Sequence, residues 1–271
     1  MNSITEFSFK KNCLVITSSG AKSRGWLDYL NIQDYQIFDS VESNPSMETV
    51  EKILSQYNQN FSYVIGLGEG SSLDVAKFVA NQLNTKKILI PTTFGSGSEV
   101  TRISVLQIDG KKNSFHSDNF LADISIIDPY FIQDAPFEII KNSAIDACAQ
   151  CTEAFDSKLA NIYTKFFCEK AFDILEKALI DETYENLAYG AMISGLGFGN
   201  SSTTLGHALS YVYSNEGISH GHALAFTTTI AHKFNDSKFY DRFKSLSDLL
   251  NFKPIKLNQN LEKAAELIQT D

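Results

Sequence analysis

The chain has 271 residues, of which 43% are hydrophobic, 12% aromatic and 20% charged, a composition typical of a globular protein with a sizeable core. Its 23 basic and 32 acidic side chains give a net charge of −9, which argues against binding to duplex nucleic acid through its phosphates. No apolar run approaches the roughly 20 residues that span a bilayer, and the first residues contain no apolar core of a signal peptide. The sequence therefore predicts a cytoplasmic protein with no nucleic-acid or membrane partner.

Short β-branched runs alternate with helical patterns through the first half of the chain. An amphipathic helix is predicted after Ser46, and another follows the third of these runs. This order predicts a doubly wound parallel sheet. The strands are predicted at residues 13–17, 35–38, 63–66 and 87–91, with further extended segments at 102–107 and 124–127.

The pattern changes at about Pro136. Alanine, leucine, glutamate and lysine become frequent, and apolar residues recur at spacings of three and four, which predicts helices. We expect an α/β domain over residues 1–134 and a helical domain over residues 135–271. A ligand site is expected in the cleft between two such domains.

Two glycine-rich turns follow the third and fourth predicted strands. In YVIGLGEGSSLDVAK, residues 63–77, the glycines allow backbone amides at the start of a helix to approach a phosphate. In ILIPTTFGSGSEVT, residues 88–101, hydroxyl groups lie where open α/β sheets hold their ligands. A tight turn or a polar loop would explain either motif alone, but the two in succession favour a ligand site.

Three of the five histidines, His207, His220 and His222, fall within a short stretch of the second half. A lone histidine is usually a core or surface residue, whereas a cluster favours metal binding or proton transfer. Asp146 lies in the apolar stretch SAIDACAQCTEAF, where a carboxylate needs a partner to offset its desolvation. One carboxylate with two imidazoles suits a divalent metal such as iron or zinc.

Four cysteines are present, and Cys148 and Cys151 form a CxxC. Without a second pair, this motif favours two reduced thiols on a helix over a zinc or redox site.

Five motifs in this order resemble the iron-containing (group III) alcohol dehydrogenases over nearly the whole chain: GLGEGSSLDVAK, IPTTFGSGSEVT, ADISIIDP, AIDACAQCTEAF and GHALSYVYSNEGISHGHALAF. Residues 203–226 look most similar to the phosphonoacetaldehyde reductases within that family. The resemblance implies a Rossmann-like dinucleotide-binding domain followed by an all-α domain, the dehydroquinate synthase-like architecture. It also implies a homodimer that uses NADP or NAD and iron(II), with zinc as the second choice of metal, to reduce a short aldehyde.

The resemblance also implies the site residues. The metal ligands fall on Asp146, His207 and His220, while Gln150 replaces the family's remaining histidine ligand. Asp146 and Gln150 share a helix face, so the glutamine amide oxygen could still point at the metal. The residues implied to lie along the cofactor are Gly68, Glu69, Gly70, Ser71, Asp74, Thr92, Thr93, Ser96 and Ser98.

Further departures from the family pattern bear on the cofactor and on proton transfer. Glu69 replaces a glycine of the phosphate motif, which would cost roughly 1–2 kcal/mol if that position needs a positive φ. Ser18 replaces the aspartate that binds the adenosine ribose in NAD-preferring relatives, so Lys22 or Arg24 could attract a 2′-phosphate and NADPH is preferred. Tyr211, with His222 nearby, stands where relatives often have a proton-relay histidine, and aromatic packing in the core is the alternative for Tyr211.

The chain is also shorter than its relatives and stops after LEKAAELIQTD. A catalytically weakened or inactive nucleotide-binding homologue is therefore an alternative to the enzyme. A sugar-phosphate cyclase is a weaker alternative, because cyclases need several basic residues around the substrate phosphates. Arg102 is a candidate for an anionic group on the substrate, although a solvated arginine is the favoured interpretation.

Overall fold

The structure is a computed structural model that describes residues 7–214 and 216–258. The terminal LEKAAELIQTD lies outside the described residues. The chain forms two compact units, Met1–Thr93 with Gly97–Ile132, and Phe94–Ser96 with Gln133–Asp271. The first is an α/β unit and the second is helical, as the sequence predicts.

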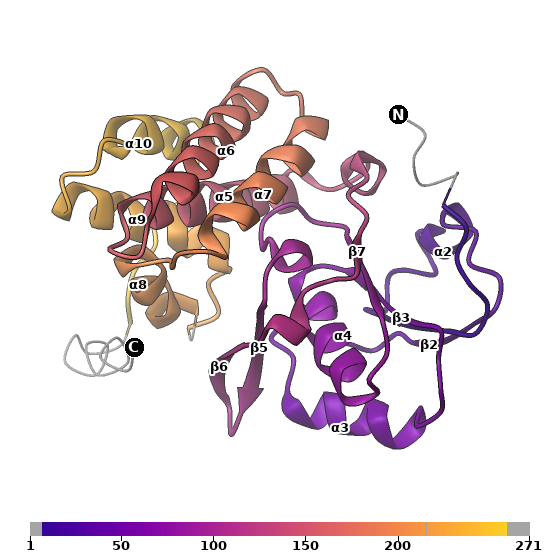
Figure 1. The fold of residues 1–271 in the computed structure, drawn as a ribbon. Helices are drawn as coiled ribbons and strands as arrows, with labels where there is room; N and C mark the ends of the chain where they lie inside the picture. The colour runs from indigo at the N-terminus through magenta and orange to yellow at the C-terminus, as the bar shows by residue number, and fades with distance from the viewer. Residues whose placement is uncertain (1–6, 215, 259–271) are drawn as a thin grey trace. The chain divides into compact units, whose positions relative to one another are not determined.

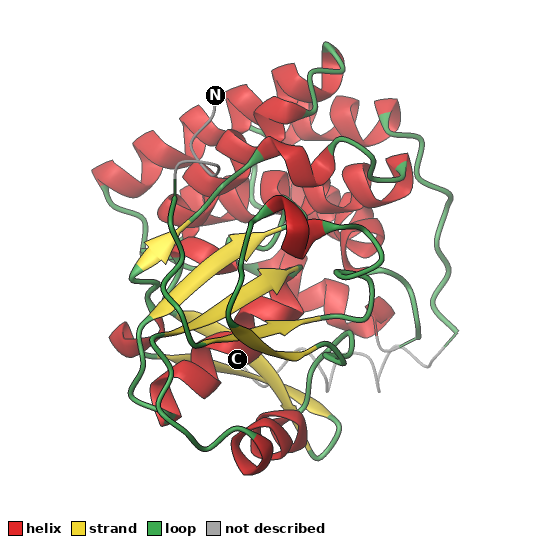
Figure 2. Ribbon diagram, turned by 90° about the vertical axis from the view of Figure 1, so that its right-hand side faces the viewer, coloured by secondary structure: helices red, strands yellow, loops and turns green. Residues whose placement is uncertain are grey.

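The first unit contains a parallel sheet whose strands lie in the order β2-β1-β3-β4-β7. The predicted bounds of the first, second and fourth strands are confirmed, and the third extends two residues further, to Gly68. Figure 2 shows the strands side by side. The strands are β1 (Cys13–Thr17), β2 (Tyr35–Phe38), β3 (Tyr63–Gly68), β4 (Lys87–Pro91) and β7 (Ile124–Ser125).

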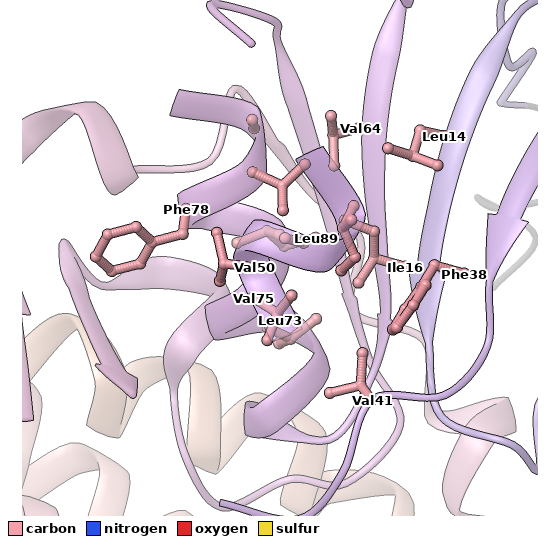
Figure 3. Close-up of a cluster of buried hydrophobic side chains, with 14 of the residues drawn as sticks. Leu14, Ile16, Phe38, Val41, Val50, Val64, Leu73, Val75, Phe78 and Leu89 are labelled. Carbon is pink, nitrogen blue, oxygen red and sulfur yellow. The ribbon is translucent and has the colours of Figure 1, made fainter. Parts of the chain in front are cut away.

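Successive side chains along each strand point to opposite sides of the sheet, and both faces of this sheet are apolar. Leu14 and Ile16 pack with α3 (Met47–Gln56) and α4 (Gly70–Gln82), as Figure 3 shows, while Cys13 and Val15 belong to the opposite core. That second core includes residues of α2 (Trp26–Tyr29) and η3 (Pro129–Ile132). The sheet is therefore buried on both faces, as expected for parallel strands.

A two-stranded antiparallel hairpin stands apart from the parallel sheet. It consists of β5 (Ile103–Ile108) and β6 (Lys111–His116), joined at Asp109 and Gly110, which both have a positive φ. The sequence predicts an extended segment at β5 but not its partner strand, because KKNSFH lacks an apolar alternation. Short 3₁₀ turns, η1 (Ser98–Val100) and η2 (Asp118–Phe120), flank the hairpin.

The second unit consists of helices in the described residues after Gln133. Helix α5 is central and packs against α6, α7, α8 and α9 (Figure 1). The segment Phe94–Ser96 also belongs to this unit, and Gly95 lies directly against Ser143 of α5. None of the described helices is both long and apolar enough to cross a bilayer. The helices are α5 (Phe137–Asp156), α6 (Ile162–Ile180), α7 (Glu185–Phe198), α8 (Leu205–Ser214), α9 (His220–Phe234) and α10 (Tyr240–Leu249).

Candidate metal and cofactor sites

Helix α5 presents Asp146 and Gln150 one turn apart, on the face that the sequence predicts. The Gln150 Nε2 atom donates a hydrogen bond to Asp146 Oδ1 at 3.0 Å. Gln150 is 6% exposed, so its amide is largely withdrawn from water.

Helices α8 and α9 each bring one imidazole to the same carboxylate oxygen. His207 Nε2 lies 3.5 Å from Asp146 Oδ1, and His220 Nε2 lies 3.8 Å from it. One ligand atom from each of these three residues lies within 4.8 Å of the others. In residues 7–214 and 216–258 this is the one group of three or more His, Cys, Asp or Glu side chains arranged to hold a metal.

Two buried atoms in this cluster, His207 Nε2 and Gln150 Oε1, make no hydrogen bond to any described residue. A buried polar atom without a partner is costly, on the order of 1–3 kcal/mol. A divalent cation beside Asp146 would accept the Nε2 lone pair, and one carboxylate with two imidazoles is a donor set for iron(II) or zinc. These residues therefore fit a first-row metal, with the Gln150 amide oxygen as a further candidate donor.

The second ring nitrogen of His207, Nδ1, lies 3.1 Å from Oε1 of the buried Glu153. Burial opposes charge on His207, but the Glu153 and Asp146 carboxylates outweigh it and raise the pKa of His207 to about 9. Burial would likewise raise the pKa of Glu153, but the charge of His207 and several hydrogen bonds lower it to about 2. Without a metal the two side chains form an ion pair, so a metal at Nε2 has to displace a proton.

Tyr211 and His222, the two proton-transfer candidates, lie in different surroundings. The Tyr211 ring is nearly parallel to that of His220, with centroids 6.3 Å apart, so Tyr211 is a neighbour of the metal cluster. His222 follows His220 by two residues on α9, about 200° around the helix. Its Nε2 donates to the Lys253 carbonyl at 2.6 Å, and its ring packs against Phe252. The geometry gives His222 a structural contact and does not support proton transfer by it.

In the first unit, the turn between β3 and α4 can receive an anion. Gly68 has a φ of 152°, and a Cβ there would lie 2.7 Å from Ser72 Oγ. The hydroxyls of Ser72 and Thr17 are buried and without a hydrogen bond among the described residues. Gly70 and Ser71 begin α4, and amides of a first helical turn have no carbonyl of their own helix to bind. Unpaired donors thus gather at the turn.

The condition for strain at Glu69, a positive φ, is not met. Glu69 caps α4 with φ −72° and ψ 175°, an extended conformation that any residue adopts. The position that requires glycine is Gly68, one residue earlier.

Asp74 and Ser98, which the resemblance places along the cofactor, bind each other. Ser98 Oγ donates to Asp74 Oδ1 at 2.6 Å, and the Val105 amide donates to Asp74 Oδ2 at 3.0 Å. The buried Lys77 lies 3.9 Å from Asp74 and donates to the Ile103 carbonyl at 2.6 Å. Burial lowers the pKa of Lys77 to about 8, against the opposing charge of Asp74. These hydrogen bonds and the ion pair connect the loop after β4 to helix α4.

The hydroxyl-rich loop after β4 is divided between the two units. The Thr92 amide donates to the Gly68 carbonyl at 2.9 Å, which places Thr92 beside the anion-binding turn. Thr93 and Ser98 belong to the same unit as Thr92, whereas Ser96 belongs to the helical unit.

The adenosine end of the expected cofactor site is marked by Ser18, which directly follows β1. Lys22 Nζ forms an ion pair with Asp39 Oδ2 at 3.3 Å, and Asp39 directly follows β2. The end of the second strand is where dinucleotide-binding folds often carry the acid that binds the ribose. Arg24 lies over the Trp26 ring instead, 5.0 Å from its centroid. Lys22 and Asp39 are thus the charged pair to consider in cofactor choice.

The structure agrees with reduced thiols at the CxxC and with a solvent-exposed Arg102, the two interpretations that the sequence favours. All four thiols are free and buried, and burial raises the pKa of Cys148 and Cys151, which disfavours the thiolate that a metal needs. Arg102 forms an exposed ion pair with Asp118 at 3.3 Å.

Two residues of these sites, Glu153 and Lys77, lie within the quoted motifs but were not predicted as site residues. For Glu153 a signal exists: it lies seven residues after Asp146 in the same apolar helix, where a second carboxylate also needs partners. For Lys77 the motif shows a lysine on α4 but not that it is buried.

Known proteins share this architecture. The model of the iron-containing alcohol dehydrogenases matches residues 2–129, and that of the C-terminal domain of the Fe-containing alcohol dehydrogenase family matches residues 140–270. The chain is 29% identical over 237 residues to 4-hydroxybutyrate dehydrogenase of Clostridium kluyveri, covering 76% of this chain and 64% of that protein. It is 31% identical over 252 residues to long-chain-alcohol dehydrogenase 1 of Geobacillus thermodenitrificans, covering 79% and 64%.

Among solved structures, sulfoacetaldehyde reductase from Bifidobacterium kashiwanohense, in complex with NAD+, has the same fold. The TM-score is 0.84 at 24% identity, covering 96% of this chain and 85% of that one. The chain spans 64% of the length of the two curated relatives. Since the two family models together match most of the chain, it belongs to the iron-containing alcohol dehydrogenase family.

Proposed function

We propose that the protein is a metal-dependent, NAD(P)H-linked alcohol dehydrogenase that reduces a short aldehyde. The observation that carries the proposal is the metal cluster: His207 Nε2, which is buried and makes no hydrogen bond to the described residues, faces Asp146 Oδ1 beside His220. Membership in the family supports iron(II) as the metal, and zinc fits the same donors.

In this function, a bound metal supplies a Lewis acid for the carbonyl oxygen and the reduced nicotinamide supplies the hydride. Asp146, His207 and His220 hold the metal. The turn at Gly68 and the first amides of α4 bind the pyrophosphate. Tyr211 holds a proton at its phenolic oxygen and donates it to the alkoxide oxygen of the product. The overall reaction converts an aldehyde, NAD(P)H and a proton into an alcohol and NAD(P)+.

We propose NADPH as a cofactor at least as good as NADH. Support comes from Ser18, which carries no charge to repel a 2′-phosphate, and from Lys22, which can turn from Asp39 toward one. Asp39 is the residue that would favour NADH instead, because its carboxylate can accept from a free ribose hydroxyl.

We propose a short aldehyde, with phosphonoacetaldehyde as the first to test. Support comes from the resemblance of residues 203–226 to the phosphonoacetaldehyde reductases. Among the relatives, 4-hydroxybutyrate dehydrogenase is named for a small substrate with an acid group, and long-chain-alcohol dehydrogenase 1 for an apolar one. A panel should therefore contain phosphonoacetaldehyde, succinic semialdehyde and a long-chain aldehyde.

Metal-free protein reconstituted anaerobically with iron(II) or zinc tests the proposal. Bound metal is counted by elemental analysis, and NADPH consumption is followed with each aldehyde. We expect one metal per chain and turnover that His220→Ala abolishes, while His116→Ala, which changes an exposed histidine, leaves both unchanged. Folded protein that binds NADPH but turns over no aldehyde would instead indicate the inactive homologue. The homodimer stays a prediction, to be checked by light scattering.

A further inference from the structure

Glu153 is a carboxylate that the metal cluster does not use directly. It lies on α5, seven residues after Asp146, and is 1% exposed. Residues seven apart lie on nearly the same face of a helix, so Asp146 and Glu153 point toward the same neighbours. A carboxylate in such a place is stable only if its oxygens are fully hydrogen-bonded.

Both Glu153 oxygens are surrounded by donors. Oε1 lies 3.1 Å from His207 Nδ1 and accepts from Thr228 Oγ1 at 2.9 Å. Oε2 accepts from the amide and hydroxyl of Thr204, at 2.7 and 3.1 Å, and from the His207 amide at 3.3 Å. Glu153 therefore holds His207 by both its ring and its backbone.

The same carboxylate caps α8. Thr204 immediately precedes this helix and His207 lies in its first turn, where amides have no carbonyl of their own helix to bind. A negative charge is also favourable at the positive end of a helix. At Gly206 a Cβ would lie 2.2 Å from Glu153 Oε1, so a glycine is needed for this close approach. The position of α8 and the position of its histidine thus depend on one side chain.

These contacts decide which nitrogen of His207 carries its proton. An ionised carboxylate only accepts hydrogen bonds, so Nδ1 must be protonated to face Oε1. In the neutral ring, Nε2 is then a bare lone pair, and it is the atom that lies 3.5 Å from Asp146 Oδ1. Two acceptors that face each other at this distance need a positive charge between them: a proton on Nε2 when no metal is bound, or a metal cation that takes the place of that proton.

We propose that Glu153 is a positioning residue for the metal. It fixes His207 with the proton on Nδ1 and Nε2 toward the metal, and its charge strengthens the imidazole as a ligand. The inference rests on the proposed metal-dependent function and deepens it, because it names the residue that orients a ligand without touching the metal.

The wild-type protein gives the first test. With zinc bound to uniformly ¹⁵N-labelled protein, long-range ¹H–¹⁵N correlation spectra distinguish the protonated from the metal-bound nitrogen of each histidine. We expect His207 to carry its proton on Nδ1 and zinc on Nε2. Zinc on Nδ1 would overturn the inference, whatever any variant does.

The second test is zinc affinity, measured by competition with a chelating indicator. Glu153→Gln keeps the shape but removes the charge, and is expected to raise the Kd about 10–100-fold. Glu138→Gln on the same helix is the matched control, because Glu138 is exposed and pairs only with Lys141 in the described contacts. It should leave the Kd unchanged. Circular dichroism melts show whether each variant is folded.

The outcomes separate the two proposals. If the wild-type protein binds zinc and folded Glu153→Gln binds it equally well, the role of Glu153 is wrong and the metal site stands. If the wild-type protein binds neither zinc nor iron(II), the proposed function itself fails. If Glu153→Gln does not fold, the wild-type spectra still decide.

Discussion

Gly221 lies where the first turn of α9 touches α5, next to the metal ligand His220. A Cβ at this position would lie 2.0 Å from the Asn142 carbonyl oxygen and 2.8 Å from the Asn142 Cα. Both atoms belong to the backbone of α5, so no side chain can turn aside to make room. Gly221→Ala is therefore expected to push the start of α9 away from α5.

The expected shift of α9 can be compared with the largest distance at which two ligand atoms still bind the same metal ion. An ordinary contact of 3.4 Å in place of 2.0 Å requires a shift of about 1.4 Å. Two ligand atoms with bonds of about 2.1 Å to one ion can be at most about 4.2 Å apart. His220 Nε2 and Asp146 Oδ1 are already 3.8 Å apart. A shift of about 0.4 Å along that line is enough to exclude a shared ion.

The change in stability should be smaller than the change in metal binding. Overpacking costs about 1–3 kcal/mol, and alanine in a helix recovers about 1 kcal/mol relative to glycine. We expect Gly221→Ala to remain folded with a lower melting temperature and to lose zinc binding in an indicator titration.

Gly190→Ala is the matched control. Its Cβ would lie 2.7 Å from Leu175 Cδ2, so it overpacks a helix contact as well, but α7 carries none of the three ligands. It should lower the melting temperature and keep the zinc affinity. If Gly221→Ala binds zinc as tightly as the wild-type protein does, the spacing of α5 and α9 does not govern the site, and the reasoning is refuted.

Gln150→His should tighten zinc binding by at least about tenfold, or about 1.4 kcal/mol, in the same titration, and unchanged affinity would show that residue 150 does not face the metal. Lys22→Ala should weaken NADPH relative to NADH several-fold in fluorescence titrations, since an exposed ion pair contributes about 0.2–1 kcal/mol, and an equal loss for both cofactors would count against contact with the 2′-phosphate. Tyr211→Phe should lower kcat by about 100-fold with NADPH affinity kept, whereas a full rate would make Tyr211 a packing residue. Burial lowers the pKa of His232 in the folded protein, against the charges of Glu153 and Asp156. Below the ordinary pKa of about 6.5 the unfolded chain therefore binds more protons than the folded protein does, and stability decreases as the pH decreases. His232→Gln should flatten the fall in urea midpoint from pH 7 to pH 5.

The parallel sheet could be predicted because its strands are continuous apolar runs, buried on both faces. The bounds of β1, β2 and β4 follow from those runs alone. Strand β6 was missed because its residues are polar and only its pairing with β5 makes it a strand. The Asp109–Gly110 turn is a hairpin signal, but the pattern of the following residues does not support it.

The metal cluster could be predicted from residue types and spacing, but the orientation of each side chain could not. His222 is only two residues from His220 in the sequence, yet it points elsewhere because α9 begins at His220 and helical spacing separates the two rings. The role of Glu153 depends on the approach of α8 and α9 to α5, which no local pattern reveals. The sequence also left open whether Glu69 needs a positive φ; the positive φ falls on Gly68 instead, because the backbone dihedral angles of a glycine-rich turn cannot be inferred from residue types.

The assignment of Phe94–Ser96 to the helical unit means that the chain leaves the α/β unit and returns to it before continuing into α5. Phe94 is 1% exposed, and Gly95 rests on the backbone of Ser143. A fragment cut after Ile132 would carry the apolar Phe94 side chain without the helical unit to which it belongs. The complementary fragment would lack one of its own core side chains. The two units are therefore not separable by a single cleavage, and expressing either half alone should yield a protein prone to aggregation.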